Sequence, residues 1–490
     1  MFTFVNELSI WQVVSVMITF AWIVSAVNHK YLKLPPSFGM TLIAVIFVVL
    51  IQFMANVVPQ HIINLDKVES LMREFDFHDF LLNGILCYLL FATAIKVQIS
   101  DLKKWWKPIA ILSFGGVFVF SFLMAGLLYG SLHIFNIALP FNYCFILAAC
   151  LAPTDPISAN AVLKKLKVDK HLETKLIGEG LWNDAAALLI FLAALDIVTK
   201  DVEFSVINVS LMLVYELVGA VFVGFLIGII CRWSIRSLDD FTSIALATLS
   251  CASLSYWIAS SFHLSGPIST VVAGLVVSYK LSEIFNNHIQ EHLDKFWEFF
   301  DELLNASLFA LIGIEVILIQ FSFSIVGLGV LAFILMNLSR YISNRLLFYP
   351  MRKNIVNGSI EIVSWGGIRG GISVALGLLL LNNTKFATNL HDMNTTYANL
   401  IIGIIFTCVI LSVSVQGMTL KYMINAFYPK KEELDKLNFI EKKIQVVFNK
   451  MNRNKNIDIH EKAVVSNGLN TNDISIENID DVDLNKSEKF

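Results

Sequence analysis

The chain has 490 residues, of which 56% are hydrophobic and only 15% are charged, and its formal net charge is −3. Soluble globular domains carry about 25% charged residues, and the mean hydropathy of +0.69 is far too apolar for a soluble protein of this length. The composition therefore excludes a water-soluble globular protein and predicts an all-α polytopic membrane protein.

About thirteen stretches are long and apolar enough to cross a bilayer, which takes roughly 20 residues each. The predicted spans are 9–28, 37–58, 77–97, 107–130, 141–164, 177–198, 205–231, 241–261, 264–279, 299–320, 322–346, 359–381 and 397–424. The 299–320 span is the weakest, because it contains Asp301, Glu302 and Glu315. The first span lacks the basic start of a signal peptide, so we expect it to be retained.

The basic residues are concentrated in alternate loops between these spans. The loops that carry them contain Lys30 and Lys33; Lys103, Lys104 and Lys107; Lys164, Lys165, Lys167, Lys170 and Lys175; Arg232 and Arg236; Lys280 and Lys295; and Arg352 and Lys353. Cytoplasmic loops carry an excess of Lys and Arg. The pattern therefore predicts a multi-pass protein of the cell inner membrane, with its N-terminus outside and its C-terminus in the cytoplasm.

The composition changes after the last span. Residues 429–490 are rich in Lys, Glu, Asp and Asn and contain few aromatic residues. Such segments cannot bury enough apolar surface to fold on their own. We expect a transmembrane domain at 1–428 and a partly disordered cytoplasmic tail at 429–490.

The six cysteines show no metal-ligand spacing, and most of them lie in apolar stretches. They are Cys87, Cys144, Cys150, Cys231, Cys251 and Cys408. We interpret them as small hydrophobic residues and not as a disulfide framework.

Ionisable residues inside apolar spans are costly and are candidates for function. Here Asp155 lies in the fifth predicted span, Glu179 and Asp184 in the sixth, Arg340 in the eleventh and Arg369 in the twelfth. Asp155 and Asp184 lie about ten residues before and after one cytoplasmic loop, so at about 1.5 Å per residue they reach a similar depth. The spacing predicts that carboxylates and arginines meet near the middle of the membrane.

Two of these spans carry residues that disrupt a helix. Pro153 and Pro156 flank Thr154 and Asp155, and proline removes a backbone donor. In the twelfth span four glycines surround Arg369 in the sequence Trp-Gly-Gly-Ile-Arg-Gly-Gly at 365–371. Paired interruptions in spans of opposite direction indicate an inverted-repeat transporter whose two broken helices cross at the binding site.

These residues resemble the monovalent cation:proton antiporter-1 family of sodium/proton exchangers, along nearly all of the predicted spans. The motifs that carry the resemblance are Thr154-Asp155-Pro156, Glu179 through Asn183-Asp184, 296–305 leading to Gly313, Arg340, and 365–370. The resemblance implies a homodimer. It further implies dimer or scaffold helices at about 9–97 and 205–320, and a moving core at about 107–198 and 322–424.

The resemblance also implies a Na+ site centred on Asp184, with help from Glu179 and the backbone at Thr154. Many relatives have serine where this chain has Gly180, four residues before Asp184 on the same helix face. A hydroxyl ligand is therefore missing, and the choice among Na+, Li+ and K+ stays open.

A buried carboxylate can bind either a proton or a cation, and this competition couples the two movements. The proposed exchange uses Asp184 in this way, and Asn183 beside it adds no second charge. The expected outcome is electroneutral exchange of one Na+ or Li+ for one H+, with alternating access, although Asp155 could also titrate.

The other charged residues have alternative structural roles. Glu179 could pair with Arg340 as well as, or instead of, binding the ion. Asp155 could cap a broken helix end. For Arg369 we favour stabilisation of the carbonyl ends at the opposite break over a gating role.

Three other functions fit parts of the pattern. They are a K+/H+ antiporter of the same fold, an intramembrane aspartyl protease with Asp155 and Asp184 as its dyad, and a channel or transport-like sensor. The chain has no Gly-x-Gly-Asp sequence and no nucleotide-binding loop. We therefore expect a transporter and not an enzyme, with no cofactor and no nucleic-acid partner, whose partners are a monovalent cation, the proton, the lipid bilayer and a second copy of the chain.

Overall fold

The structure is a computed structural model, and it divides the chain into two compact units, Met1–Tyr428 and Pro429–Phe490. It describes residues 10–32, 39, 43, 46, 84–97, 109–137, 139–155, 170–199, 206–279, 281, 287–315, 322–349, 358–380, 386, 389–390 and 395–427. All of these belong to the first unit. The predicted tail at 429–490, Pro156 and nearly all of the span at 37–58 lie outside the described residues.

The described chain is helical, apart from a two-residue antiparallel pair between β1 (Asn389–Leu390) and β2 (Thr395–Thr396). Among the residues that the structure describes, six helical segments are long and apolar enough to cross a membrane: Ile111–Ile134, Gly178–Thr199, Leu211–Ile235, Phe241–Ser261, Phe323–Phe348 and Tyr397–Phe427. The predicted all-α membrane class is therefore confirmed. The total of about thirteen spans and the inverted repeat remain predictions.

Several helices begin at residues that satisfy their free backbone N–H groups. Asp240 accepts a hydrogen bond from the N–H of Ser243 at the start of α12 (Phe241–Ser261), and the hydroxyl of Ser322 accepts one from the N–H of Ile325 at the start of α16 (Phe323–Phe348). Such caps replace the intrahelical acceptors that a first turn lacks. The sequence analysis placed both helices within two residues of their observed ends.

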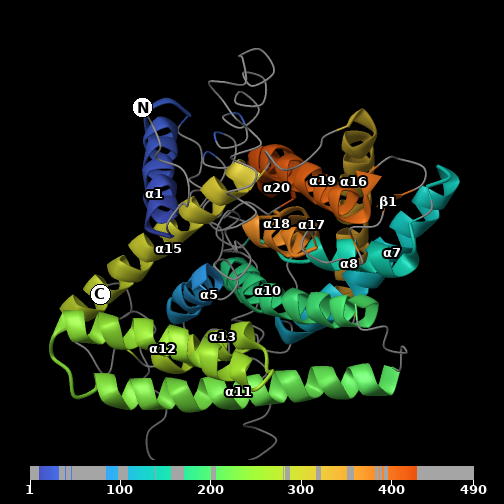
Figure 1. Ribbon diagram of the computed structural model, residues 1–490. Coiled ribbons are helices and arrows are strands. Elements are labelled where there is room, and N and C mark those ends of the chain that lie inside the picture. The colour runs from blue at the N-terminus through green and yellow to red at the C-terminus, as the bar shows by residue number, and fades with distance from the viewer. Residues whose placement is uncertain are drawn as a thin grey trace, which may run out of the picture. The chain divides into compact units, whose positions relative to one another are not determined.

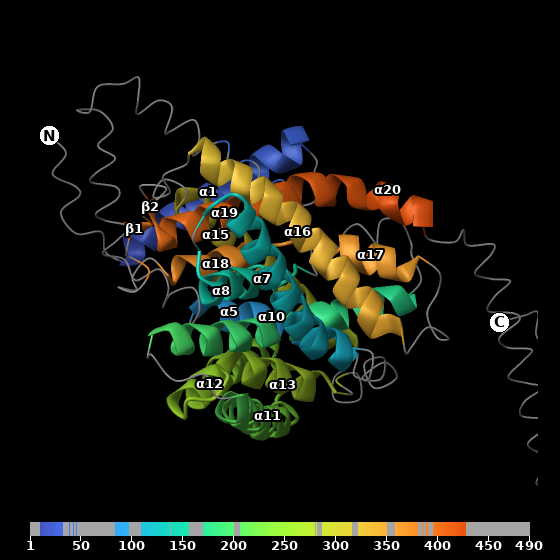
Figure 2. The same cartoon turned by 90° about the vertical axis from the view of Figure 1, so that its right-hand side faces the viewer.

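By their contacts the described helices form two bundles, and Figures 1 and 2 show α11 (Val206–Ile235), α12 and α13 (Gly266–Ser278) together at the bottom of the view. The first bundle contains η3 (Ile111–Gly115, a π-helical turn), α7 (Gly116–Ile134), α8 (Phe141–Cys150), α10 (Lys170–Thr199), α16 (Phe323–Phe348), α17 (Ser359–Trp365), α18 (Gly371–Leu378), α19 (Tyr397–Leu411), η7 (Ser412–Gln416, also π-helical) and α20 (Gly417–Phe427). Its helices pack mainly on one another, with α16 lying against α7 and α19.

The second bundle contains α5 (Leu86–Ile95), α11 (Val206–Ile235), α12 (Phe241–Ser261), α13 (Gly266–Ser278) and α15 (Asn287–Glu315), with α1 (Ile10–Val27) and its π-helical end η1 (Asn28–Leu32) packed against α15. In Figure 1, α11 lies at the bottom, with α12 and α13 directly above it, and α10 of the first bundle comes next. Helix α15 begins twelve residues before the predicted span at 299–320, because an amphipathic segment precedes the apolar part.

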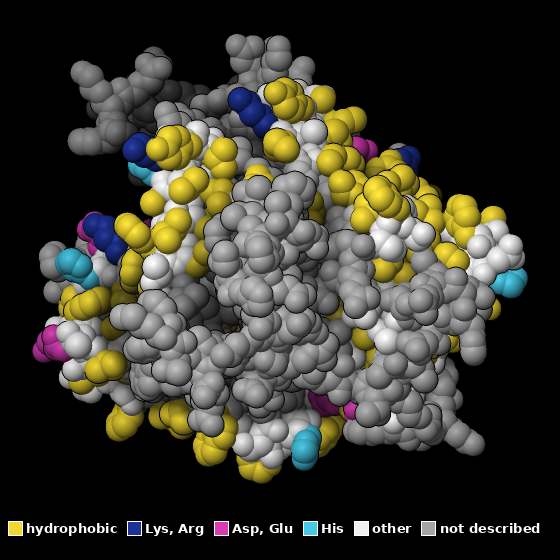
Figure 3. Space-filling model, turned by 45° about the horizontal axis from the view of Figure 1, so that its top comes forward, with side chains coloured by type: hydrophobic (Ala, Val, Ile, Leu, Met, Phe, Trp, Pro, Cys, Tyr) yellow, Lys and Arg dark blue, Asp and Glu magenta, His cyan; other side chains and the backbone are white. Residues whose placement is uncertain are grey.

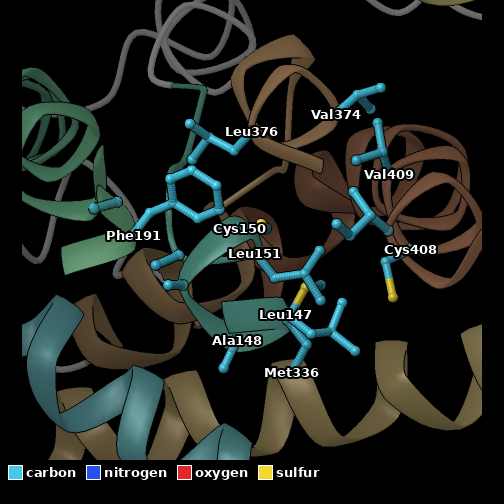
Figure 4. Packing of buried hydrophobic residues seen from close by; sticks show 14 of the residues in the cluster. Leu147, Ala148, Cys150, Leu151, Phe191, Met336, Val374, Leu376, Cys408 and Val409 are labelled. Carbon is cyan, nitrogen blue, oxygen red and sulfur yellow. The ribbon is translucent and has the colours of Figure 1, made fainter. Parts of the chain in front are cut away.

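The core of the first bundle is closely packed and almost entirely apolar. Figure 4 shows Leu147 of α8 and Leu151, which directly follows that helix, beside Phe191, Met336 and Leu376 of three further helices. The six cysteines are buried and unpaired, so they act as small apolar residues here, as the sequence predicted.

The outer surface is apolar as well. Large hydrophobic side chains are exposed along α11, including Tyr215, Phe222 and Phe225, and yellow hydrophobic groups cover much of the described surface in Figure 3. A soluble protein seldom exposes so much contiguous apolar surface. An apolar exterior of this kind is expected for a protein that faces lipid.

Candidate functional site

The chain leaves the helical conformation at the first predicted interruption. Helix α8 ends at Cys150, and residues 151–155 continue without regular structure. Pro153 lacks a backbone N–H and disfavours a helical conformation in the residue before it. The carbonyl groups of Ala152 and Pro153 are therefore free to accept hydrogen bonds from outside the helix.

The second interruption separates α17 from α18 at residues 366–370. Gly367 lies directly against a buried arginine: a Cβ atom at this position would lie 2.1 Å from Arg340 Nε. Only glycine permits this approach of the backbone to the guanidinium. The glycines of this segment therefore provide space as well as freedom to unwind.

The two interruptions are joined by hydrogen bonds. The Asp155 N–H donates to the Ile368 carbonyl at 2.7 Å. In the opposite direction, Arg369 Nη1 donates to the carbonyls of Ala152 and Pro153, the latter at 3.0 Å. Arg369 is fully buried, so its charge compensates the carbonyl dipoles of the broken end. For Arg369 we favoured this stabilisation of the carbonyl ends at the opposite break over a gating role.

Two nitrogen atoms of Arg369, Nε and Nη2, have no hydrogen-bond partner among the described residues. Its guanidinium lies 4.8 Å from the ring centre of Phe120, within the range of a cation–π contact.

Asp184 lies beside the first interruption. Its carboxylate oxygen Oδ1 accepts a hydrogen bond of 3.2 Å from the Thr154 N–H, and the residue is 8% exposed. The role of the Thr154 backbone as an ion ligand stays a prediction, and the contact that the structure shows is its amide on Asp184. The broken backbone thus supplies a donor that holds the carboxylate in place.

Asn183 organises the same segment from the neighbouring position. Its Nδ2 donates to Thr154 Oγ1 at 2.8 Å and to the Ala152 carbonyl at 3.2 Å. An aspartate in its place would face two acceptors and could donate to them only when protonated. Asn183 therefore has a structural role in addition to adding no charge beside Asp184.

Glu179 and Arg340 form a buried ion pair. Arg340 Nη2 donates to Glu179 Oε1 at 2.7 Å, and the two side chains are 4% and 8% exposed. This pairing is the structural alternative that the sequence left open for Glu179. Both residues line a small cavity together with Asn183, and this cavity is separate from the one at the Asp184 carboxylate.

A larger cavity lies at the Asp184 carboxylate. Asp184, Thr154 and Asp155 line it, together with Gly370 and Gly371 of the second interruption. Its volume of about 50 Å³ has room for roughly three water-sized groups. The structure thus brings Asp184, Asp155 and Thr154 to one cavity and places Glu179 and Asn183 outside it.

The sequence analysis missed the wall that the second bundle contributes. Thr93 of α5 and Asn305 of α15 line the same cavity, and Asp301 next to Asn305 pairs with Lys96 at 3.0 Å. The 296–305 stretch stood out as a motif but was given no role. The sequence did contain a signal for this wall, because the polar residues Asp301 and Asn305 are four apart and share one helix face.

These features define a class of protein. Interrupted membrane helices that meet around a buried carboxylate, at a cavity with room for a small hydrated ion, are the arrangement of an ion-coupled secondary transporter. The charges and carbonyls at the crossing are paired with each other, and Asp184 is left facing the cavity.

Comparison with known proteins agrees with this class. The transmembrane sodium/hydrogen exchanger family matches residues 15–426. The Na(+)/H(+) antiporter NhaP of Pseudomonas aeruginosa is 30% identical over 85% of this chain and 97% of its own length. The Na(+)/H(+) antiporter NhaH of Halobacillus aidingensis is 28% identical over 74% of this chain and 86% of its own length. The chain therefore belongs to the sodium/hydrogen exchanger family.

The fold has a solved counterpart. The structure of the sodium proton antiporter MjNhaP1 from Methanocaldococcus jannaschii superimposes with a TM-score of 0.66 at 20% identity, covering 84% of this chain and 96% of that one. At this identity the likeness establishes the fold.

Proposed function

We propose that this protein exchanges Na+ or Li+ for H+ across the cell inner membrane and so contributes to pH homeostasis, with the cation and the proton competing for Asp184. Its family and the names of its relatives support sodium/proton exchange. They do not favour the K+/H+ antiporter, the aspartyl protease or the sensor.

The observation that carries the proposal is the position of Asp184 in the cavity between the two interruptions. Burial disfavours a bare charge, so the site is most easily carried through the apolar barrier when a cation or a proton neutralises it. The same carboxylate cannot bind both tightly. This competition couples the two movements without any other energy source.

Within this proposal the ligands are Asp184, the polar backbone at Thr154, and water, and Asp155 lines the same cavity. Glu179 is tied to Arg340 and lines a different cavity. We therefore assign Glu179, Asn183, Arg340 and Arg369 to holding the crossing together.

The proposed stoichiometry is one cation for one proton, because Asn183 adds no titrating group to Asp184. The moving part is the first bundle, which carries both interruptions, and the second bundle is the scaffold and the dimer domain. The outward-facing apolar side chains of α11 suit contact with lipid or with a second copy. We place the N-terminus outside and the C-terminus in the cytoplasm, from the distribution of basic loops.

The test uses proteoliposomes with an imposed proton gradient and a pH-sensitive dye inside. Na+, Li+ or K+ is added to the wild type, to Asp184→Asn and to Asp196→Asn, with and without a clamped membrane potential. Asp196 is on the same helix, three turns from Asp184, and does not line the cavity. Asp196→Asn is therefore the control for Asp184→Asn, because it removes one carboxylate from the same helix outside the cavity.

We expect a Na+- or Li+-driven pH change in the wild type and in Asp196→Asn that the clamp does not alter, and none in Asp184→Asn. A response to K+ alone would change the substrate and keep the mechanism. Well-folded wild-type protein that shows no cation-linked proton movement would overturn the proposal.

A further inference from the structure

The second bundle supplies one wall of the Asp184 cavity. Thr93 on α5 and Asn305 on α15 are the polar residues of that wall, beside Leu89, Leu90 and Leu308. The Thr93 hydroxyl donates to the Leu89 carbonyl within its own helix. Asn305 differs from Thr93, because an amide offers both a donor and an acceptor, and its orientation decides which of the two faces an ion.

The orientation of Asn305 is determined by its partners. Its Nδ2 donates to the Asp301 carbonyl at 2.9 Å and to Asp301 Oδ1 at 3.0 Å. Both partners can only accept hydrogen bonds, so the group that faces them is the NH2 and not the oxygen. The amide oxygen Oδ1 lies on the other branch of the planar group and is the polar atom that Asn305 can offer to the cavity.

Asp301 is itself held in place. Lys96 Nζ at the end of α5 donates to Asp301 Oδ2 at 3.0 Å, and the aspartate side chain is 9% exposed. One carboxylate oxygen therefore binds Lys96 and the other binds Asn305. The ion pair links α5 to α15.

We infer that Asn305 is a specificity-determining residue, whose Oδ1 supplies a neutral oxygen to the cation bound at Asp184, directly or through one water. Lys96 and Asp301 are positioning residues that keep the oxygen turned toward the cavity. This inference rests on the proposed cation exchange at Asp184. It adds a ligand from the second bundle to a site that otherwise consists of residues from the first.

A neutral oxygen suits this place for two reasons. Na+ and Li+ prefer hard oxygen ligands, and the cavity volume of about 50 Å³ leaves room for only about three water-sized groups, so the protein has to replace part of the hydration shell. An amide oxygen also does not titrate. Its removal should weaken cation binding without changing the affinity of Asp184 for a proton.

The test compares wild type, Asn305→Ala, Asn305→Ser and the control Ser307→Ala in the proteoliposome assay. Ser307 lies two residues further along α15, is buried, bonds only to the Leu303 carbonyl of its own helix in the described contacts, and does not line the cavity. The concentration of Na+ that gives half-maximal exchange, the maximal rate and the pH profile at fixed Na+ are measured for each monodisperse variant.

We expect the half-maximal Na+ concentration of Asn305→Ala to rise by about tenfold, which is the loss of one good contact, with the maximal rate kept within a factor of two to three. Because the proton then competes more effectively, the acid limb of the pH profile at fixed Na+ should move up by about one pH unit for a tenfold loss. Asn305→Ser keeps an oxygen and should be intermediate. Ser307→Ala should match the wild type.

Unchanged half-maximal Na+ and an unchanged acid limb in Asn305→Ala would overturn the inference while leaving the exchange at Asp184 intact. A fall in the maximal rate alone would overturn it too, because that result indicates a structural role. If Asn305→Ala does not fold, Asn305→Ser decides by the same two measurements. Absence of exchange in the wild type would remove both the proposed function and this inference.

Discussion

Glu179 and Arg340 form an ion pair at 2.7 Å, at positions where water scarcely reaches. Taking two ions out of water costs several kcal/mol each, and their attraction offsets that cost only while both are present. The Glu179 backbone carbonyl also accepts a hydrogen bond from the Ser113 hydroxyl. The pair therefore joins α10 to α16 at the level of the crossing.

Replacing one residue of the Glu179–Arg340 pair should lower the stability of the protein much more than replacing both. We predict that Arg340→Met lowers the free energy of unfolding by about 3–5 kcal/mol, because it leaves Glu179 charged and unpaired. The double variant Glu179→Leu with Arg340→Met should recover most of that loss. Unfolding in detergent, titrated with a denaturing surfactant and followed by tryptophan fluorescence, measures the difference.

A second ion pair of the same length provides the control. Lys295 and Glu291 also meet at 2.7 Å, but each is 66% exposed. Lys295→Ala should change the stability by less than about 1 kcal/mol, as is usual for solvated pairs. Equal losses in Arg340→Met and Lys295→Ala would contradict the role assigned to burial.

At the scale of elements, the interruptions at 151–155 and 366–370 depend on local backbone chemistry. Each interrupted segment presents backbone groups that a continuous helix would have used internally, and each finds its partners on the other segment. Membrane proteins tolerate such unwound backbone only where it is buried in protein or lines a polar cavity. Both conditions are met here.

The second interruption should be sensitive to a single methyl group. In Gly367→Ala the added Cβ would lie 2.1 Å from Arg340 Nε, and Arg340 cannot move away without losing Glu179. Overpacking of this kind costs about 1–3 kcal/mol, so we predict a lower melting temperature and a loss of exchange.

Gly327 on α16 provides the matched control, because a Cβ there would meet no atom within 4 Å. Gly327→Ala should be neutral or slightly stabilising, since alanine favours a helix by up to about 1 kcal/mol over glycine. Thermal unfolding in detergent and the dye assay together test both variants. A Gly367→Ala protein as stable and active as Gly327→Ala would show that this close approach is not required.

At the scale of the whole molecule, the proposed mechanism needs the two bundles to move against each other. A small apolar cluster lies where they meet, with Ala185 and Leu189 of α10 against Ile268 and Val272 of α13. The bundles also meet elsewhere, because Leu90 of α5 and Leu308 of α15 belong to the large apolar cluster that the first bundle forms. Small apolar side chains without hydrogen bonds between the helices suit a surface that slides.

Locking this surface should stop exchange. We predict that Ala185→Cys with Ile268→Cys, oxidised by a membrane-permeable catalyst, loses Na+-driven proton movement and regains it on reduction. The control is a pair inside the first bundle, Met124→Cys with Ser339→Cys, whose parent side chains are in contact. The protein that carries this control pair should exchange Na+ for H+ normally after oxidation. Continued exchange by the locked α10–α13 protein would contradict movement between the bundles.

Much of this site could be predicted from one sequence because its signals are local. Charges in apolar spans, prolines around Asp155 and glycines around Arg369 are visible in a few neighbouring residues, and their cost in a membrane makes them informative. The basic loops likewise predict an orientation by simple alternation. The family motifs added the order and the spacing of these signals.

The sequence by itself predicted that the chain crosses the membrane as helices, where it leaves the helical conformation near Pro153 and Gly366, and that Glu179, Asp184, Arg340 and Arg369 are buried. Only the tertiary structure decided the partners: Glu179 with Arg340, the Thr154 amide with Asp184, and Asn305 in the wall of the cavity. The physical reason is that burial and helix breaking follow from local composition. Pairing depends on which side chains from segments far apart in sequence come within about 3 Å of each other.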